Sequence, residues 1–284
     1  MDIKVSEIHD KKLIENYLPE DPYLHLNNLG DLDDFFRPES RWFAFKSEER
    51  VLSIILMYKD IRMPVLSGLN HIVELESGMD KIRPSPILPE KFNAHLSPYF
   101  SKILDREFYL ESSGLHHNMA LRDFKQIEKM NFSGVSPLEM KDRDELLDLY
   151  RISSPHNWVN ERMPDTGLYY GFRMNGRIVS LAGIHVYSEE YREAALGNIS
   201  THPGYRNQGS GAKVTACLCR EISRHADHIG LNVPTGNFTA NSVGRQTTLR
   251  RQTTVLRQTT VRRQTTVAGP RLPDHRLDLP FPTK

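Results

Sequence analysis

Two stretches of the chain share one pattern of apolar and polar positions, about 127 residues apart. In the first, an apolar run at residues 42–45 is followed by a polar turn and a longer apolar run at 51–58. The second repeats this arrangement at residues 169–172 and 178–187, with the pair Asn175-Gly176 in its turn. Short apolar runs bounded by turn residues are typical of buried strands, and Asn-Gly favours a tight hairpin. The pattern therefore predicts two β-hairpins.

Each hairpin is preceded by an acidic stretch with helical spacing of its apolar residues, at residues 10–17 and 141–150. The repeated order of helix and hairpin suggests a duplicated unit, although chance similarity between two hairpins would give the same pattern. We expect an α/β fold with a mixed sheet of the α+β kind, built from tandem units. The predicted limits are 1–130 for a degenerate first unit, 131–243 for the second unit and 244–284 for a separate tail.

The tail begins with a strict six-residue period, in which Arg245, Arg251, Arg257 and Arg263 open successive copies of RQTT. Six is not a helical period, but the Thr-Thr-Val content permits either a strand or a β-prone disordered segment. Residues 268–284 contain four prolines and are predicted to be unstructured. A tandem six-codon duplication explains the repeat most simply, and a selected basic arm is the alternative.

Composition excludes several classes of protein. The net charge is +1, yet residues 244–284 hold nine basic against two acidic residues, so the rest of the chain is mildly acidic and has no reason to bind nucleic acid specifically. No apolar run approaches the roughly 18 to 20 residues that span a membrane. Cys217 and Cys219 lie two apart in a predicted helix, where they cannot pair, and His116-His117 lacks metal-ligand partners. We expect a cytoplasmic protein without a metal.

The most informative segment is a predicted strand at 194–203, a loop with three glycines at 204–211 and a helix from 212 to 225. Successive backbone N–H groups at a helix start, reinforced by the helix dipole, can bind a polyanion, and glycines let phosphate oxygens approach the backbone. Arg206 can add a charge-assisted hydrogen bond. The loop lacks the Gly-Lys-Ser/Thr of a Walker loop and the third glycine of a dinucleotide-binding fingerprint.

The segment Thr201-His202-Pro203-Gly204-Tyr205-Arg206-Asn207-Gln208-Gly209-Ser210-Gly211 resembles the central motif of the GNAT acyltransferases. Residues 231–233, followed by Asn237 and Ala240, resemble the next strand and helix start of that family. The resemblance covers residues 133–243. It reaches the first half only weakly, as the degenerate amino-terminal unit of tandem or glycine-acyltransferase-like members.

This resemblance implies a mixed sheet whose fourth and fifth strands splay apart around acetyl-CoA or another short acyl-CoA. It also implies transfer of the acyl group to a primary amine, either a small molecule or a protein amino group. The residues that the resemblance assigns to acyl-CoA binding are Ile199, Ser200, Thr201, Arg206, Asn207, Gln208, Gly209, Ser210, Gly211 and Asn237.

Two side chains are candidates for moving the amine proton. His185 lies on the inner hairpin strand with an expected pKa near neutrality, and Glu193 enters the next strand. The alternative for His185 is a structural histidine whose hydrogen bonds are made within the strand, and the alternative for Glu193 is an exposed carboxylate at the edge of the sheet. Where the family has a proton-donating tyrosine this chain has Gly244, and the last helix and strand pair have no recognisable equivalents. A catalytically impaired acyl-CoA-binding protein is therefore the second functional hypothesis.

Overall fold

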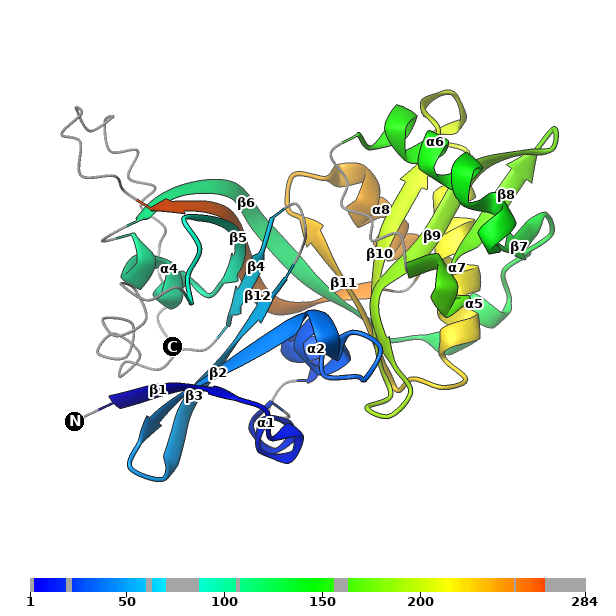
Figure 1. Ribbon diagram of the computed structural model, residues 1–284. Helices are drawn as coiled ribbons and strands as arrows, with labels where there is room; N and C mark the ends of the chain where they lie inside the picture. Colours follow the sequence, from blue (N-terminus) through cyan, green and yellow to red (C-terminus); the bar gives the residue numbers. More distant parts are fainter. Residues whose placement is uncertain are drawn as a thin grey trace, which may run out of the picture.

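A computed structural model describes residues 3–18, 22–59, 63–69, 87–105, 108–155, 163–247 and 249–263. They form a 12-stranded sheet in the order β1-β2-β3-β4-β5-β12-β6-β11-β10-β9-β8-β7 (Figure 1). The predicted mixed sheet of an α/β protein is therefore confirmed. Because the sheet is continuous across the molecule, the proposed domain limits remain a prediction.

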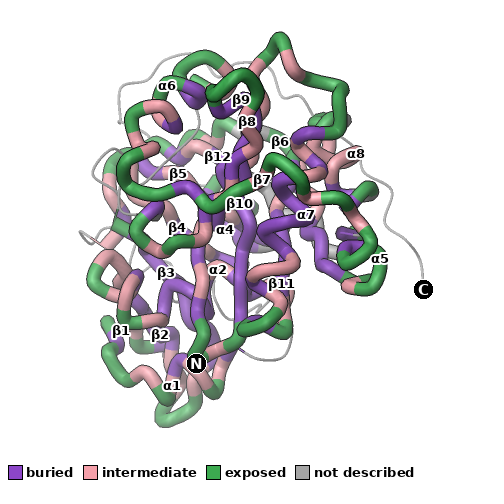
Figure 2. The backbone as a smooth tube through the Cα atoms, turned by 90° about the vertical axis from the view of Figure 1, so that its right-hand side faces the viewer, coloured by how far each residue is buried: buried purple, intermediate pink, exposed green. Residues whose placement is uncertain are grey.

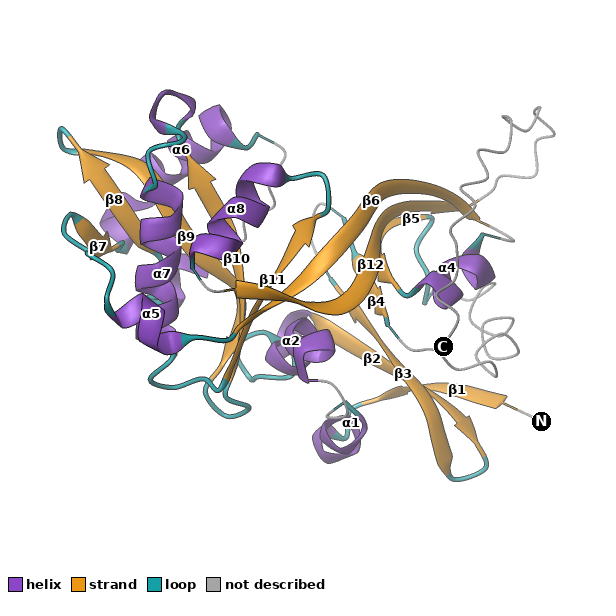
Figure 3. Ribbon diagram, turned by 180° about the vertical axis from the view of Figure 1, so that it is seen from behind, coloured by secondary structure: helices purple, strands orange, loops and turns teal. Residues whose placement is uncertain are grey.

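The first half of the chain supplies one side of the sheet. Its strands are β1 (Ile3–Ile8), β2 (Ser40–Ser47), β3 (Arg50–Tyr58), β4 (Val65–Gly68) and β5 (Lys91–Leu96). The helices here are α1 (Lys11–Tyr17), α2 (Pro22–Gly30), the short 3-10 helix η1 (Arg37–Glu39) and α4 (Pro98–Leu104). The long strands β6 (Phe108–Leu121) and β12 (Leu249–Arg263) form the centre, where they curve across the molecule side by side (Figure 3).

The second half supplies the other side. Its strands are β7 (Val135–Pro137), β8 (Tyr170–Met174), β9 (Arg177–Ser188), β10 (Glu193–Thr201) and β11 (His228–Pro234). Its α-helices are α5 (Phe124–Glu128), α6 (Arg143–Ser153), α7 (Ser210–Ile222) and α8 (Phe238–Gln246), and its 3-10 helices are η2 (Met140–Asp142), η3 (Met163–Thr166) and η4 (Pro203–Tyr205).

Both predicted hairpins are confirmed. β2 pairs with β3 and β8 pairs with β9, each antiparallel. In the second hairpin Asn175 has a φ of 51° and Gly176 a φ of 78°, and two successive positive φ values are what a tight I′ turn needs. The pairing continues alike in both halves, because β3 and β9 each pair antiparallel with the next strand, which then pairs parallel with the one after it. This shared pattern supports the duplication.

The tail contains a strand, which is one of the two alternatives that its composition left open. Residues 249–263 form β12, which pairs antiparallel with β5 on one side and β6 on the other. The expectation that no helix follows β11 is wrong, because α8 is present, and β12 supplies one strand after it where a strand pair was expected to be missing. The partners of β12 come from residues more than 120 positions away, which no local pattern reveals. The proline-rich end at 268–284 lies outside the described residues.

Burial follows the sheet, with buried residues along the strands and on the inner sides of the helices (Figure 2). The predicted stripe of α7, made of Val214, Leu218 and Ile222, is fully buried against the second half of the sheet. Leu26 of α2 belongs to the same buried cluster, so a helix of the first half helps to build the core of the second. No helix in the described ranges is long and apolar enough to cross a membrane.

Candidate functional site

A cleft opens where β10 and β11 separate. The two strands pair in parallel only from Glu193–Leu196 on β10 and His228–Leu231 on β11. Beyond Leu196, β10 keeps its pairing with β9 on its other side. A cleft of about 650 Å³ then lies between the carboxyl-terminal parts of the two strands, with walls from β10, β11, α8 and the start of α7. The predicted residues Ile199, Ser200 and Thr201 all line this cleft. The backbone of these three residues has no pairing with β11, so its free edge faces the cleft.

The glycine loop closes one end of the cleft. Asn207 and Gly209 both adopt left-handed backbone angles, with φ values of 62° and 78°, and α7 begins at Ser210. The first helical bond is Lys213 N to Gly209 O, so the amides of residues 210–212 precede the helical ladder and have no acceptor within it. Ser210 Oγ is buried against the cleft without a hydrogen-bond partner in the described structure. This arrangement suits an anionic group with several acceptor oxygens.

The residues predicted for acyl-CoA binding gather around this cleft, with one exception. Those that line it are Ile199, Ser200, Thr201, Arg206, Asn207, Gly209, Ser210, Gly211 and Asn237. Gln208 is exposed in the loop and is not among the lining residues. Arg206 is held at the mouth by hydrogen bonds from Nε to Thr201 O at 3.2 Å and from Nη2 to Ser153 O at 3.1 Å.

A strained bulge shapes β10 inside the cleft. The β9–β10 register shifts between Gly197 and Ser200, and Asn198 there has a φ of 55°, which costs free energy in a non-glycine residue. Buried side chains fix this conformation. Tyr150 Oη donates to Asn198 O at 2.6 Å, and Asn198 Nδ2 donates to Tyr169 Oη at 2.8 Å. The bulge therefore presents a fixed run of backbone to the cleft.

His185 lines the cleft as predicted, but its titration differs from the expectation. Burial lowers the pKa of His185 to about 4, rather than leaving it near neutrality. A Cβ atom on Gly197 would lie 2.1 Å from His185 Cδ2, so the absence of a side chain at 197 leaves room for the imidazole. His185 is therefore uncharged at neutral pH, and its low pKa makes the imidazole a weak base.

Glu193 lies elsewhere. It sits at the paired end of β10, is 3% exposed and does not line the cleft, so it is not an exposed edge carboxylate. Its Oε1 is 2.9 Å from His228 Nδ1, while Oε2 is buried without a partner in the described structure. Burial, with a smaller contribution from Asp227, raises the pKa of Glu193 to about 8, and burial also lowers the pKa of His228. The pair therefore shares one proton near neutral pH.

The wall formed by α8 changes the interpretation of Gly244. Asn237 caps this helix, since its Oδ1 accepts from Ala240 N at 3.0 Å. The α8 residues that face the cleft include Ala240, Val243 and Gln246. Gly244 faces β6 instead, because a Cβ atom there would lie 2.5 Å from Met119 Cε. A tyrosine at position 244 would thus project toward β6.

Four residues of this region were missed from the sequence: Tyr150, Tyr169, Asn198 and His228. Asn198 and the tyrosines act through a bulge, and a bulge leaves no mark in the alternation of apolar residues. The parallel register aligns Glu193 with His228. Extending the predicted strand at 231–233 toward its amino end was the one signal that could have found His228.

The comparisons with known proteins agree with this geometry. Residues 123–243 match the model of the Acetyltransferase (GNAT) family. No curated protein matches the chain significantly.

Several solved structures share the fold across nearly the whole chain. An acetyltransferase from the GNAT family from Colwellia psychrerythraea has 12% identity, covers 92% of this chain and 100% of its own, and has a TM-score of 0.56. A GCN5-related N-acetyltransferase from Sphaerobacter thermophilus has 8% identity, coverages of 92% and 95%, and a TM-score of 0.59. A tandem GNAT protein from the clavulanic acid biosynthesis pathway has 10% identity, coverages of 95% and 100%, and a TM-score of 0.54.

These structural likenesses show the fold, and the family match covers β10, α7, β11 and most of α8, the elements that enclose the cleft. The chain therefore has the fold of tandem GNAT proteins, and its residues 123–243 match the acetyltransferase (GNAT) family model.

Proposed function

We propose that this protein transfers an acetyl or other short acyl group from acyl-CoA to a primary amine, on a small molecule or a protein. The cleft between β10 and β11 carries the proposal, because it joins a free strand edge to an anion-binding helix start. Acyl-CoA needs both features, since it combines an amide-containing arm with a pyrophosphate. The bound acyl-CoA supplies an activated thioester.

The residues of the cleft divide into two groups. The amides at the start of α7, Ser210 Oγ and Arg206 would hold the pyrophosphate, while the backbone of residues 199–201 would pair with the pantetheine arm. The fixed bulge at Asn198 keeps this strand edge in one conformation. Preorganised backbone groups of this kind cost no reorganisation when charge develops on the thioester oxygen.

His185 is the better candidate for accepting the amine proton. Its position in the cleft lining supports this role, whereas its basicity does not, because burial lowers its pKa to about 4 and so disfavours the protonated form. Glu193 does not line the cleft and shares its proton with His228. During transfer, the amine nitrogen would form a bond to the acyl carbon as the carbon–sulfur bond breaks, and its proton would pass to His185 Nδ1 or Nε2.

The hypothesis of a catalytically impaired acyl-CoA-binding protein loses its main support. It rested on a missing helix and strand pair after β11, and the described residues after β11 form the helix α8 and the strand β12. Gly244 adds little to it, since that position faces Met119. We also propose a reducing, cytoplasmic setting, because Cys217 and Cys219 are both free and buried.

Turnover of acetyl-CoA with a panel of primary amines tests the proposal. Release of the free CoA thiol and a mass gain of one acetyl group on an amine are expected together. His185→Asn should lower kcat by about a hundredfold or more with little change in acetyl-CoA affinity. The matched control is His225→Asn, which alters an exposed imidazole far from the cleft lining. Acetyl-CoA binding without turnover of any amine would support the impaired protein instead.

A further inference from the structure

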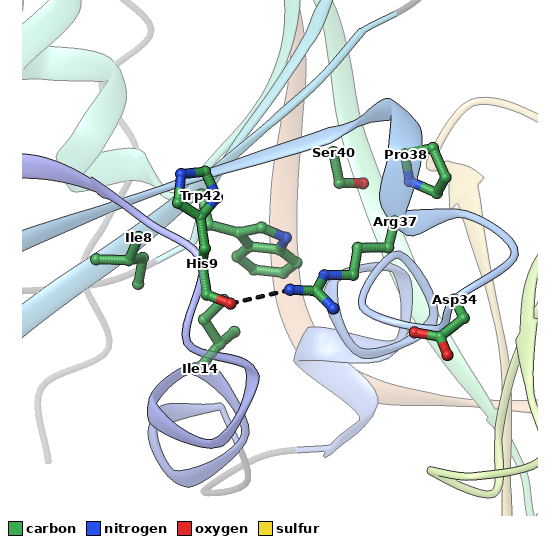
Figure 4. Close-up of a pocket in the computed structure, with 8 residues that line it drawn as sticks. All are labelled: Ile8, His9, Ile14, Asp34, Arg37, Pro38, Ser40 and Trp42. Atoms are coloured by element: carbon green, nitrogen blue, oxygen red, sulfur yellow. Dashed lines mark hydrogen bonds between the residues drawn. The ribbon is translucent and has the colours of Figure 1, made fainter.

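A second cavity lies in the first half of the molecule. It encloses about 350 Å³ between the end of β1, α1, η1 and the start of β2 (Figure 4). None of its lining residues lines the cleft. Its function is therefore independent of the acyl-CoA site.

Two hydrogen-bond donors in the wall of this cavity lack acceptors. Trp42 is 3% exposed, and its indole Nε1 is buried without a partner in the described structure. Ser40 Oγ, on the same strand and also in the lining, is likewise buried and unpartnered. Leaving a buried polar group unpaired is costly, so an acceptor atom bound here would be favoured.

Arg37 adds a positive charge at the same place. Its side chain extends into the cavity, and Nη2 donates to His9 O at 2.9 Å (Figure 4). Within the described ranges no carboxylate forms an ion pair with Arg37. The Asp34 carboxylate also lines the cavity but is 84% exposed, and it lies 3.6 Å from Lys11 Nζ, which makes a shorter ion pair of 2.6 Å with Glu190.

The buried part of the remaining wall is apolar. Ile8 and Ile14 are 7% and 1% exposed, and the Trp42 ring forms part of the lining. The cavity thus combines this apolar surface with two neutral donors and one cation, and His9 and the exposed Asp34 complete the polar part of its lining. A carboxylate is an acceptor-only group with two oxygens that such a set of donors can share.

We propose that this cavity binds a small monocarboxylate with an apolar body. Its oxygens would accept from Trp42 Nε1, Ser40 Oγ and Arg37, and its apolar part would contact Ile8 and Ile14. Arg37 would exchange its bond to the His9 carbonyl for a charge-assisted one. Partial displacement of Arg37 would also give the ligand access to the buried donors.

Benzoate and its neutral isostere benzamide provide the test. The chain has two tryptophans, so Trp158→Phe leaves Trp42 as the sole fluorescent reporter. Benzoate is expected to change the Trp42 emission saturably, with at least tenfold higher affinity than benzamide. Arg37→Met should weaken benzoate binding by about tenfold or more and leave benzamide unchanged. Arg50→Met, at an exposed arginine outside the cavity, is the matched control.

If Trp158→Phe does not fold, saturation-transfer NMR can compare the binding of benzoate and benzamide to the unaltered chain and to Arg37→Met. Equal affinity for the two probes, or benzoate affinity that survives in Arg37→Met, would overturn the proposal. No saturable binding of benzoate would overturn it as well. Acetyl-CoA affinity is expected to be the same in Arg37→Met and the unaltered chain, so this outcome is separate from the proposed transferase function.

Discussion

The two halves of the molecule use the same order of strand pairings and arrive at different surfaces. In the second half, β10 has nine residues, separates from β11 after Leu196 and leads into a glycine loop. In the first half, β4 has four residues, and each of them pairs with β5. The comparison teaches that the sheet topology alone makes no acyl-CoA site. The site needs a longer strand, a bulge and a helix start.

Polar groups follow the same division. The bulge of β10 is held by Tyr150 and Tyr169 through Asn198, whereas the pairing of β4 with both neighbours is regular. The first half instead carries unpartnered donors at Ser40 and Trp42, on β2, which is separated from the parallel pair β4–β5 by β3. The two halves therefore share a strand order but carry their unusual polar groups on different strands, β10 in the second half and β2 in the first.

The largest expected effect concerns the strand between the halves. Deleting residues 249–284 would leave β5 and β6 without their shared neighbour and remove the buried side chains of Leu249 and Val261. We expect loss of cooperative unfolding in circular dichroism. A truncated chain that unfolds cooperatively with unchanged midpoint would show that the halves are independent of β12.

The second largest effect is expected in the glycine loop after β10, which has no counterpart in the sequence after β4 in the first half. Replacing Gly209 and Gly211 by valine should abolish measurable CoA binding in calorimetry while the protein stays folded. Gly209 has a φ of 78°, and a Cβ atom on Gly211 would lie 3.3 Å from Thr201 Oγ1. Gly176→Val imposes similar backbone strain in a distant turn, so it should retain CoA binding. Unchanged affinity in a folded double variant would rule out the loop as the phosphate site.

A smaller effect is expected at Arg206. Arg206→Ala should weaken CoA binding by about 1 to 3 kcal/mol, the usual loss for a hydrogen bond to a charged group. Pantetheine lacks the pyrophosphate and should bind the variant and the unaltered chain equally. Arg192→Ala, at an exposed arginine paired with Asp227, serves as the control. An equal loss for both ligands would indicate damage to the fold.

The smallest effect is the pH dependence of the Glu193–His228 pair. Unfolded, the two groups titrate near 4.5 and 6.5, whereas the folded pair keeps its shared proton until the pKa of about 8 for Glu193. Between pH 6.5 and 8 the folded state therefore holds more protons, and stability falls as pH rises, by up to about 2 kcal/mol.

Urea unfolding at both pH values measures this decline. Glu193→Gln should remove most of it, because glutamine does not titrate. The control Glu128→Gln changes an exposed carboxylate and should keep the decline. The same slope in Glu193→Gln and the unaltered chain would mean that other groups cause it.

What could be predicted from the sequence follows from the range of each signal. Local patterns identified the hairpins, the stripe of α7 and the loop from Arg206 to Gly211. They left open whether residues 249–263 form a strand, because its partners lie on β5 and β6, and they gave the wrong pKa for His185, which depends on its burial in the fold. The direction in which a side chain at position 244 would point is likewise hidden from the sequence, because its neighbour Met119 is brought near only by the sheet.

The repeat in β12 has a consequence for how this strand can change over time. Leu249 and Val261 occupy the same position in the RQTT unit, twelve residues apart, and both are fully buried. Six is an even number, and side chains of a strand alternate with a period of two, so every copy directs the same positions inward. A gain or loss of one whole copy would therefore keep the Leu or Val position of each remaining copy on the same face of the strand.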